Sequence, residues 1–281
     1  MQHSESSFTG SGGLSLFRQT WQDTPSSRAG MALVHGFGEH SGRYRNVVDH
    51  LVPIGIDIYS YDHRGHGRSE GRRGHVRNWG EFRDDLGRFL RLVRKENGDR
   101  PLFVMGHSMG GLILLNYLLH EPETEVRAVI ASSPLLAQPS ISQVLVLLSR
   151  VMSLAWPGFS IDTGVDAGTI SRDPAEVQAY LDDPLVHSKA SARFGTELSA
   201  AIEWTQRHAP AFKFPVMIIH GDTDRLVPVS GSRQFFDHIG SEDKEFHLYA
   251  GGFHESHNDI EKETVLKDIE NWLFKHLMDA R

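Results

Sequence analysis

The sequence contains no cysteine. This absence excludes disulfides, thiolate metal sites and a cysteine nucleophile, so covalent catalysis would have to use serine, threonine, lysine or a carboxylate. Positive charge is also scarce, because 29 Lys and Arg face 36 Asp and Glu, giving a net charge of −7. That balance argues against a protein that mainly binds nucleic acid, which needs a basic surface. The 17 histidines leave acid–base and metal chemistry open.

Long hydrophobic runs are missing as well. The first 13 residues are polar and rich in Ser and Gly, without the basic and apolar regions of a signal peptide. The longest apolar stretch, residues 144–156, is interrupted by Ser149 and Arg150 and is too short to span a bilayer. We therefore expect a cytoplasmic protein that touches membranes at most peripherally.

Short apolar runs alternate with amphipathic helical patterns along the chain. Runs that are apolar on both faces indicate strands buried in a parallel sheet, and residues 14–21 are expected to form the second arm of a hairpin. The predicted buried strands are 31–35, 56–61, 101–106, 126–132, 216–220 and 244–249. Helical spacing of apolar residues predicts helices over 82–93 and 266–276. This alternation predicts an α/β fold, with a mostly parallel central sheet flanked by helices.

One interval departs from this alternation. Residues 135–214 show no strand pattern, only helical segments interrupted by prolines, and no linker-like tract separates them from the rest. We expect this interval to be an inserted helical cap on a single domain that spans residues 1–281.

The most informative motif is Gly106-His107-Ser108-Met109-Gly110, which fits the pattern G-x-S-x-G. An apolar strand precedes it and a helix, residues 112–120, follows it. In this context the glycines allow a tight strand-to-helix turn that exposes a strained serine at the edge of the sheet. The N-terminus of the helix adds partial positive charge where an oxyanion would develop. Ser108 is therefore the predicted nucleophile.

A serine nucleophile of this kind needs a base and an acid, which follow it in the order Asp or Glu, then His. Asp222 and Asp224 both follow the strand 216–220, and spacing alone does not choose between them. His254 follows the strand 244–249 and is the predicted base. His257 is its rival, although a surface histidine at the start of a helix is the simpler interpretation of that residue.

The motif also needs two donors to an oxyanion. One is expected to be the backbone N–H of Met109, directly after the nucleophile. The other should come from the loop His35-Gly36-Phe37-Gly38-Glu39. Phe37 is the favoured donor there, because the flanking glycines let its amide turn inward.

Several segments together resemble the monoglyceride lipases and their lysophospholipase-like relatives in the α/β-hydrolase superfamily. The similar segments are 35–44, 62–71, 106–111, 133–136, 171–173, 183–185, 224–226 and 252–254. The resemblance implies that Asp224, not Asp222, is the acid and that His254 is the base. It also implies an α/β-hydrolase fold with a cap, no cofactor, and an acyl-enzyme mechanism on monoacylglycerols, lysolipids or short acyl esters. Animal members carry cysteines near the site, so this chain should be insensitive to thiol reagents.

The cap is expected to bind the acyl chain of a lipid or ester substrate. Leu147, Val151 and Leu154 belong to an apolar segment that would line an acyl channel and touch a lipid surface by its outer face. The alternative is a helix packed wholly on the body of the protein.

Other functions are weighed against this one. The same elbow serves aminopeptidases, perhydrolases and carbon–carbon hydrolases, and the scaffold also supports non-catalytic binding proteins. A metallohydrolase using His254 and His257 is a further alternative, although His254-Glu255-Ser256-His257 is one residue short of a zinc motif. Glu70 replaces the last glycine of a dinucleotide fingerprint, and there is no Walker loop. We therefore expect no metal, no cofactor and no nucleic-acid partner.

Overall fold

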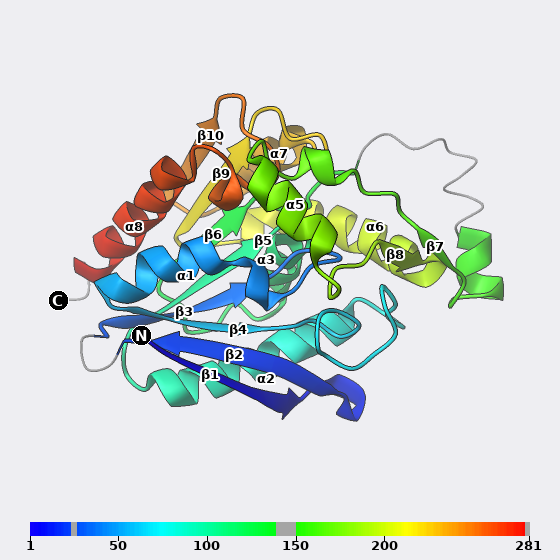
Figure 1. Cartoon of the computed structure of the whole chain (residues 1–281), viewed down its shortest axis with the longest axis horizontal. Coiled ribbons are helices and arrows are strands. Elements are labelled where there is room, and N and C mark those ends of the chain that lie inside the picture. The colour runs from blue at the N-terminus through cyan, green and yellow to red at the C-terminus, as the bar shows by residue number, and fades with distance from the viewer. Residues whose placement is uncertain (24–26, 139–149, 279–281) are drawn as a thin grey trace.

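The computed structural model describes residues 1–23, 27–138 and 150–278, and its centre is an eight-stranded sheet (Figure 1). The strand order is β1-β2-β4-β3-β5-β6-β9-β10. The strands are β1 (Gln2–Thr9), β2 (Ser15–Gln22), β3 (Ala29–Val34), β4 (Ile56–Tyr61), β5 (Leu102–His107), β6 (Val129–Ser132), β9 (Val216–Gly221) and β10 (Lys244–Tyr249). The β1–β2 hairpin is antiparallel, and β2 pairs antiparallel with β4. All pairs from β4 to β10 are parallel, which confirms the predicted α/β fold.

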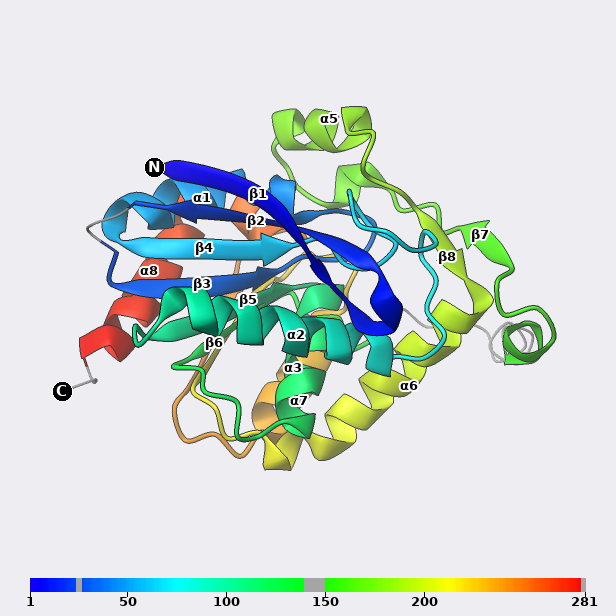
Figure 2. The same cartoon turned by 90° about the horizontal axis from the view of Figure 1, so that it is seen from below.

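Helices cover both faces of the sheet. The helices α1 (Arg45–Leu51) and α8 (Lys262–Met278) lie on one face, whereas α2 (Gly80–Asn97), α3 (Met109–His120) and α7 (Val229–His238) cover the other (Figures 1 and 2). Successive strand residues alternate between two cores, as the two-residue period of a strand requires. In β3, Met31 and Leu33 pack under α1 and α8, whereas Ala32 and Val34 pack under α2 and α3.

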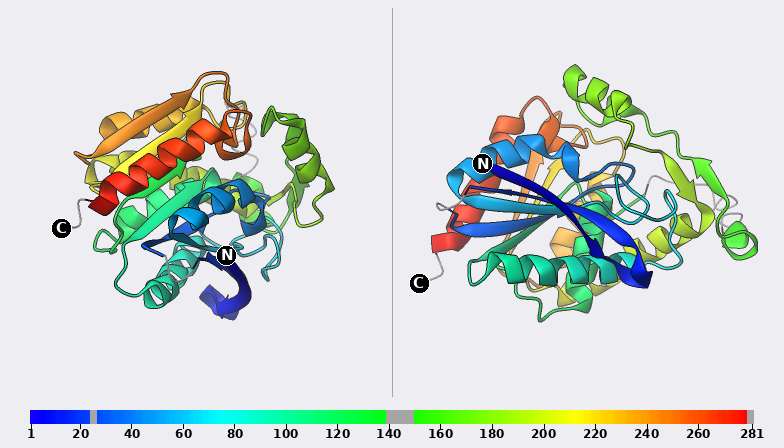
Figure 3. Two further views of the ribbon diagram at one scale, coloured as in Figure 1. Left: turned by 60° about the vertical axis from the view of Figure 1, so that its left-hand side comes forward. Right: turned by 60° about the horizontal axis from the view of Figure 1, so that its bottom comes forward.

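The segment between β6 and β9 lies at the carboxyl end of the parallel strands, away from both chain termini (Figure 3). It contains a helical stretch at residues 150–155, α5 (Pro174–Asp182) and α6 (Ala192–His208). Contrary to the expectation of helices alone, it also contains two strands, β7 (Ser160–Asp162) and β8 (Lys189–Ser191), which pair antiparallel. Each has three residues, too few for a two-residue period to stand out in the sequence.

Backbone hydrogen bonds dock this segment onto the body. The N–H of His187 donates to the carbonyl of Gly38 at 2.8 Å, and the N–H of Ser191 donates to the carbonyl of Gly74 at 2.9 Å. Phe194 and Leu198 of α6 are buried in the core that also contains α3. The docking therefore combines main-chain bonds with apolar packing.

The two-core arrangement predicts the cost of removing a central side chain. Phe103 on β5 is fully buried in the core beneath α1 and α8, so Phe103→Ala should lower the free energy of unfolding by about 3–5 kcal/mol. Leu248, which is exposed on the edge strand β10, is the control, and Leu248→Ala should change that free energy by no more than about 0.5 kcal/mol. Urea denaturation followed by circular dichroism measures both, and equal losses would contradict the assignment of the core.

Candidate active site

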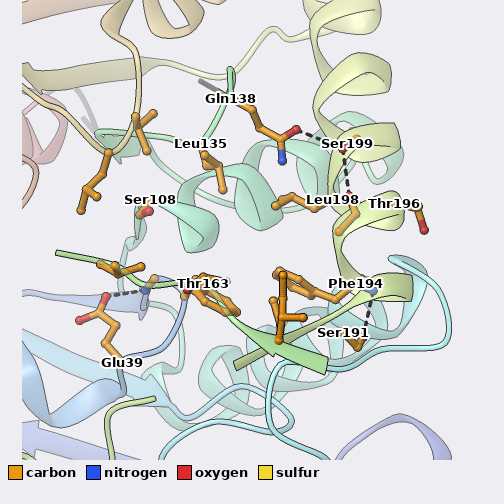
Figure 4. A pocket seen from close by; sticks show the side chains of 18 of the residues that line it. Glu39, Ser108, Leu135, Gln138, Thr163, Ser191, Phe194, Thr196, Leu198 and Ser199 are labelled. Carbon is orange, nitrogen blue, oxygen red and sulfur yellow. Dashed lines mark hydrogen bonds between the residues drawn. The ribbon is translucent and has the colours of Figure 1, made fainter. Parts of the chain in front are cut away.

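Ser108 occupies the turn between β5 and α3. Its backbone has φ 54° and ψ −121°, a strained conformation that side chains rarely adopt. The flanking glycines make this turn possible, because a Cβ at Gly106 would lie 2.6 Å from the carbonyl oxygen of Gly110. A Cβ at Gly110 would lie 2.2 Å from the carbonyl oxygen of Val34. The serine is thus held at the start of α3, on the wall of a cavity (Figure 4).

His254 and Asp224 come from the loops after β10 and β9 and meet beside this cavity. The Nδ1 of His254 lies 2.7 Å from Oδ2 of Asp224, and both side chains are almost fully buried. The other carboxylate oxygen of Asp224 accepts the N–H groups of Leu226 and Val227 at 2.8 and 2.9 Å. The carboxylate is therefore fixed by its own loop while it contacts the imidazole.

The pair shifts the pKa values of both groups. Burial alone would raise the pKa of Asp224, but the adjacent His254 and the hydrogen bonds from His220, His254 and the loop hold it well below its ordinary value. Burial alone would lower the pKa of His254, but the charge and hydrogen bond of Asp224 raise it above 6.5. Asp224 is therefore ionised at neutral pH and stabilises a protonated His254.

The two residues that competed with this pair are placed differently. Asp222 is exposed, and its Oδ1 accepts the N–H of Gly251 at 2.6 Å, so it braces the loop before His254. His257 is not the surface residue that the sequence suggested, because it is fully buried and stacks on Tyr44 with ring centroids 4.9 Å apart. Burial lowers the pKa of His257 to about 4. Of the two histidines, only His254 lines the cavity.

A further histidine, His220, contacts Asp224, although no motif in the sequence singles it out. This residue ends the apolar run of β9 and is fully buried, with Nε2 3.1 Å from Oδ2 of Asp224 and Nδ1 2.9 Å from Oγ of Ser232. It thus contacts the same carboxylate oxygen as His254. The signal in the sequence that could have indicated this role is a polar residue at the end of an apolar strand.

The loop after β3 approaches Ser108 from the other side. His63 donates its backbone N–H to Nε2 of His35 at 2.9 Å, so His35 carries its proton on Nδ1 and donates it to the carbonyl of Gly36 at 2.7 Å. Because a trans peptide points its N–H opposite to its carbonyl, this bond fixes the direction of the Phe37 amide. Within the described part of the chain, neither the Phe37 N–H nor the Met109 N–H has a hydrogen-bond acceptor.

The cavity beside Ser108 has a volume of about 830 Å³ and lies between the body and the segment 135–214. Its wall is mainly apolar. The apolar lining includes Phe37, Leu135, Met152, Phe159, Val165, Ile170, Phe194, Leu198, Leu226 and Val227. Two carboxylates, Glu39 and Glu255, line the same cavity as Ser108 and His254.

The residues expected to line an acyl channel are placed as follows. Val151 and Leu154 are exposed, the latter by 79%, and the cavity lining includes Arg150 and Met152 in their place. Their side chains are exposed to solvent, whereas Ser153 in the same short helical stretch is buried. Leu147 lies outside the described residues.

Two further observations concern metals and membranes. Among residues 1–23, 27–138 and 150–278, no group of three or more His, Asp or Glu side chains could hold a metal ion. In the same ranges, no helix is long and apolar enough to cross a membrane.

A serine at a strand–helix elbow, with an aspartate–histidine pair on later loops of the same sheet, defines an α/β-hydrolase. Residues 25–261 match the family model described as serine aminopeptidase, S33. The chain is 38% identical to the monoacylglycerol lipase of Mycolicibacterium smegmatis, over 98% of both chains. It is 31% identical to the monoglyceride lipase of Homo sapiens, over 94% of this chain and 88% of the relative.

Solved structures agree with these sequence relatives. The crystal structure of the Paleococcus ferrophilus monoacylglycerol lipase is 34% identical, with a TM-score of 0.84 over 93% of this chain and 99% of that one. The chain therefore belongs to the S33 hydrolases, and within them to the monoglyceride lipase family. It is a carboxylic ester hydrolase.

The contact between Asp224 and His254 predicts the titration of the imidazole. In the wild-type protein the His254 ring signals should titrate with a pKa above 6.5, measured by NMR. Asp224→Asn removes the charge that raises this pKa but leaves the burial that lowers it, so the pKa should fall below 6.5. Asp222→Asn is the matched control and should leave it unchanged. If the pKa of His254 fell only in Asp222→Asn, Asp222 and not Asp224 would be the partner of His254.

Proposed function

We propose that this protein hydrolyses monoacylglycerols through an acyl-enzyme on Ser108, with His254 as base and Asp224 as its partner. The observation that carries the proposal is that Ser108 and His254 line one mainly apolar cavity, while His254 contacts the buried Asp224. The names of the relatives, monoacylglycerol and monoglyceride lipases, support the same substrate.

The first half of the reaction forms the acyl-enzyme. His254 accepts the hydroxyl proton of Ser108 as the serine oxygen attacks the ester carbonyl, and Asp224 stabilises the imidazolium that results. When the tetrahedral intermediate collapses, His254 gives this proton to the leaving glycerol oxygen. In the second half, water donates a proton to His254 and attacks the acyl carbon, and the serine leaves with that proton.

The negative oxygen of each tetrahedral intermediate is assigned to the amides of Phe37 and Met109. Both N–H groups lack an acceptor in the described structure, and Met109 is the first residue of α3. Fixed donors at this position stabilise the charge without reorganising, and each contributes about 3–4 kcal/mol in related sites.

Substrate class follows from the shape and polarity of the cavity. A single acyl chain fits an apolar cavity of about 830 Å³, and the carboxylates of Glu39 and Glu255 give the end near Ser108 a polar character. In this proposal residues 135–214 form the cap of a single domain and enclose the acyl chain.

The nucleophile is tested by replacing it. Ser108→Ala should lower kcat by a factor on the order of 10⁶ with a monoacylglycerol and with a nitrophenyl ester, because no other group forms the acyl-enzyme. It should also abolish labelling by a fluorophosphonate probe. Asp224→Asn should lower kcat by about 10⁴-fold, whereas Asp222→Asn should retain most activity. Wild-type turnover by Ser108→Ala would overturn the proposal.

A panel of substrates tests the proposed substrate class. The enzyme should cleave monoacylglycerols faster than lysolipids and should not cleave aminoacyl nitroanilides. Preference for the nitroanilides would instead assign the aminopeptidase activity named in the description of the family model.

We further propose that the cap touches lipid surfaces. Large apolar side chains are exposed along one segment of it, namely Val151, Leu154, Trp156 and Ile161. The Arg72 guanidinium donates to the carbonyl of Gly158, which ties this segment to the body. An exposed apolar segment beside the cavity would let a substrate pass from the lipid phase without crossing water.

Vesicle binding tests this contact. The double variant Leu154→Ser/Trp156→Ser should bind phosphatidylcholine vesicles at least tenfold more weakly, since each apolar side chain that enters the lipid contributes about 1.5–3 kcal/mol. Leu248→Ser, an exposed apolar residue on β10, is the matched control and should bind like wild type. Equal binding by all three proteins would contradict the proposal. Activity on a soluble nitrophenyl ester should not change in either variant.

A further inference from the structure

Glu39 makes contacts that the proposed mechanism does not use. Its Oε1 accepts the backbone N–H of Gly36 at 2.6 Å and the hydroxyl of Tyr44 at 2.7 Å. The side chain is 4% exposed and lies on the same cavity as Ser108 (Figure 4). A buried carboxylate is thus bonded directly to the loop that carries the Phe37 amide.

Gly36 lies tightly between this carboxylate and the nucleophile. A Cβ at Gly36 would be 2.8 Å from Oε1 of Glu39 and 3.2 Å from Cβ of Ser108. The Glu39 bond holds the N–H of Gly36, while His35 holds its carbonyl. The two bonds fix the peptides on both sides of Gly36, and the second of these peptides contains the Phe37 N–H.

Glu39 shares one guanidinium with a second buried carboxylate. Arg43 donates from Nη2 to Oε2 of Glu255 at 2.9 Å, whereas its Nε is 3.5 Å from Oε2 of Glu39. That Oε2 has no hydrogen-bond partner in the described part of the chain. All hydrogen bonds of the Glu39 carboxylate are therefore made by Oε1, to the loop and to Tyr44.

We propose that Glu39 is a positioning residue for the oxyanion hole, which holds Gly36 so that the Phe37 amide points at the reacting carbonyl. The inference rests on the proposed function, since it takes Phe37 as an oxyanion donor. It concerns acyl transfer itself, so it applies to esters of any alcohol.

The charged and titratable groups around Glu39 give this role a pH dependence. They are Arg43 and Tyr44 from its own segment, Tyr180 from α5, and His254 and Glu255 from the loop after β10. Burial and the charge of Glu255 raise the pKa of Glu39 to about 7, against the opposing effects of Arg43, Tyr44 and Gly36. Below that pH the carboxyl gains a proton and becomes a weaker acceptor for the Gly36 N–H.

Protonation of Glu39 and protonation of His254 should both lower the activity as the pH falls. Glu39 is ionised and holds the loop above pH 7, and His254 is an effective base only above its own raised pKa. Activity should therefore fall with decreasing pH more steeply than a single proton allows. In a variant whose residue 39 does not titrate, the fall of activity with decreasing pH should correspond to the uptake of a single proton.

The experiment compares Glu39→Ala, Glu39→Gln and Glu255→Gln with two substrates, nitrophenyl butyrate and a monoacylglycerol. Glu39→Ala should lower kcat about 10- to 100-fold on both, less than the loss of a whole oxyanion donor, with KM changed less than about threefold. Glu39→Gln, which keeps an oxygen that can accept from Gly36, should recover part of kcat and show the one-proton fall. Glu255→Gln removes a charge from the same pair with Arg43 but no bond to the loop, so it should lower kcat on the nitrophenyl ester less than Glu39→Ala does.

Three outcomes would overturn the inference. One is a loss confined to the monoacylglycerol, which would assign Glu39 to the alcohol and not to the oxyanion loop. Another is an equal loss of kcat in Glu39→Ala and Glu255→Gln on the nitrophenyl ester. The third is an unchanged pH slope in Glu39→Gln. Thermal melting identifies a variant that fails to fold, in which case Glu39→Gln decides. Failure of the proposed function is seen separately, as activity in Ser108→Ala.

Discussion

The left-handed backbone of Ser108 is the constraint on which the rest of the active site depends. A side chain at φ 54° is unfavourable by itself, so the surrounding structure has to enforce it. It does so through close backbone contacts that only glycine allows, at Gly106 against α3 and at Gly110 against the end of β3. The same contacts bring the loop after β3 next to the serine. Strain at Ser108 and placement of the loop after β3 thus share one cause, the tight packing of β5, α3 and β3.

Buried charge at this site is always matched by a partner. The imidazole of His254 contacts the carboxylate of Asp224, and the carboxylates of Glu39 and Glu255 share Arg43. Unpaired, any of these charges would be costly in an apolar cavity. Their pairing allows ionised groups to lie next to the apolar wall of the cavity. The pKa values of both His254 and Glu39 are raised, that of His254 by the charge of Asp224 against the effect of burial, and that of Glu39 by burial and the charge of Glu255.

Much of the fold and site was predictable because it depends on short-range rules. Strands buried on both faces are apolar throughout, and a serine between glycines needs a strand before it and a helix after it. The choice between Asp222 and Asp224 depended on the family resemblance, because two residues on one loop differ in direction and not in reach. The burial of His257 and the contact of His220 with Asp224 depend on packing between distant segments, which no local pattern reveals. The strands β7 and β8 could not be predicted, because a strand of three residues is too short to show an alternating pattern of apolar and polar residues.

The bond from His187 to Gly38 joins the segment between β6 and β9 to the loop after β3 through main-chain atoms alone. Such a bond does not depend on which side chain stands at position 187. Residues of that segment that line the cavity can therefore be exchanged while the attachment to the loop after β3 is retained. In evolutionary terms, the fold separates the part of the segment that lines the cavity from the part that keeps the loop beside Ser108 in place.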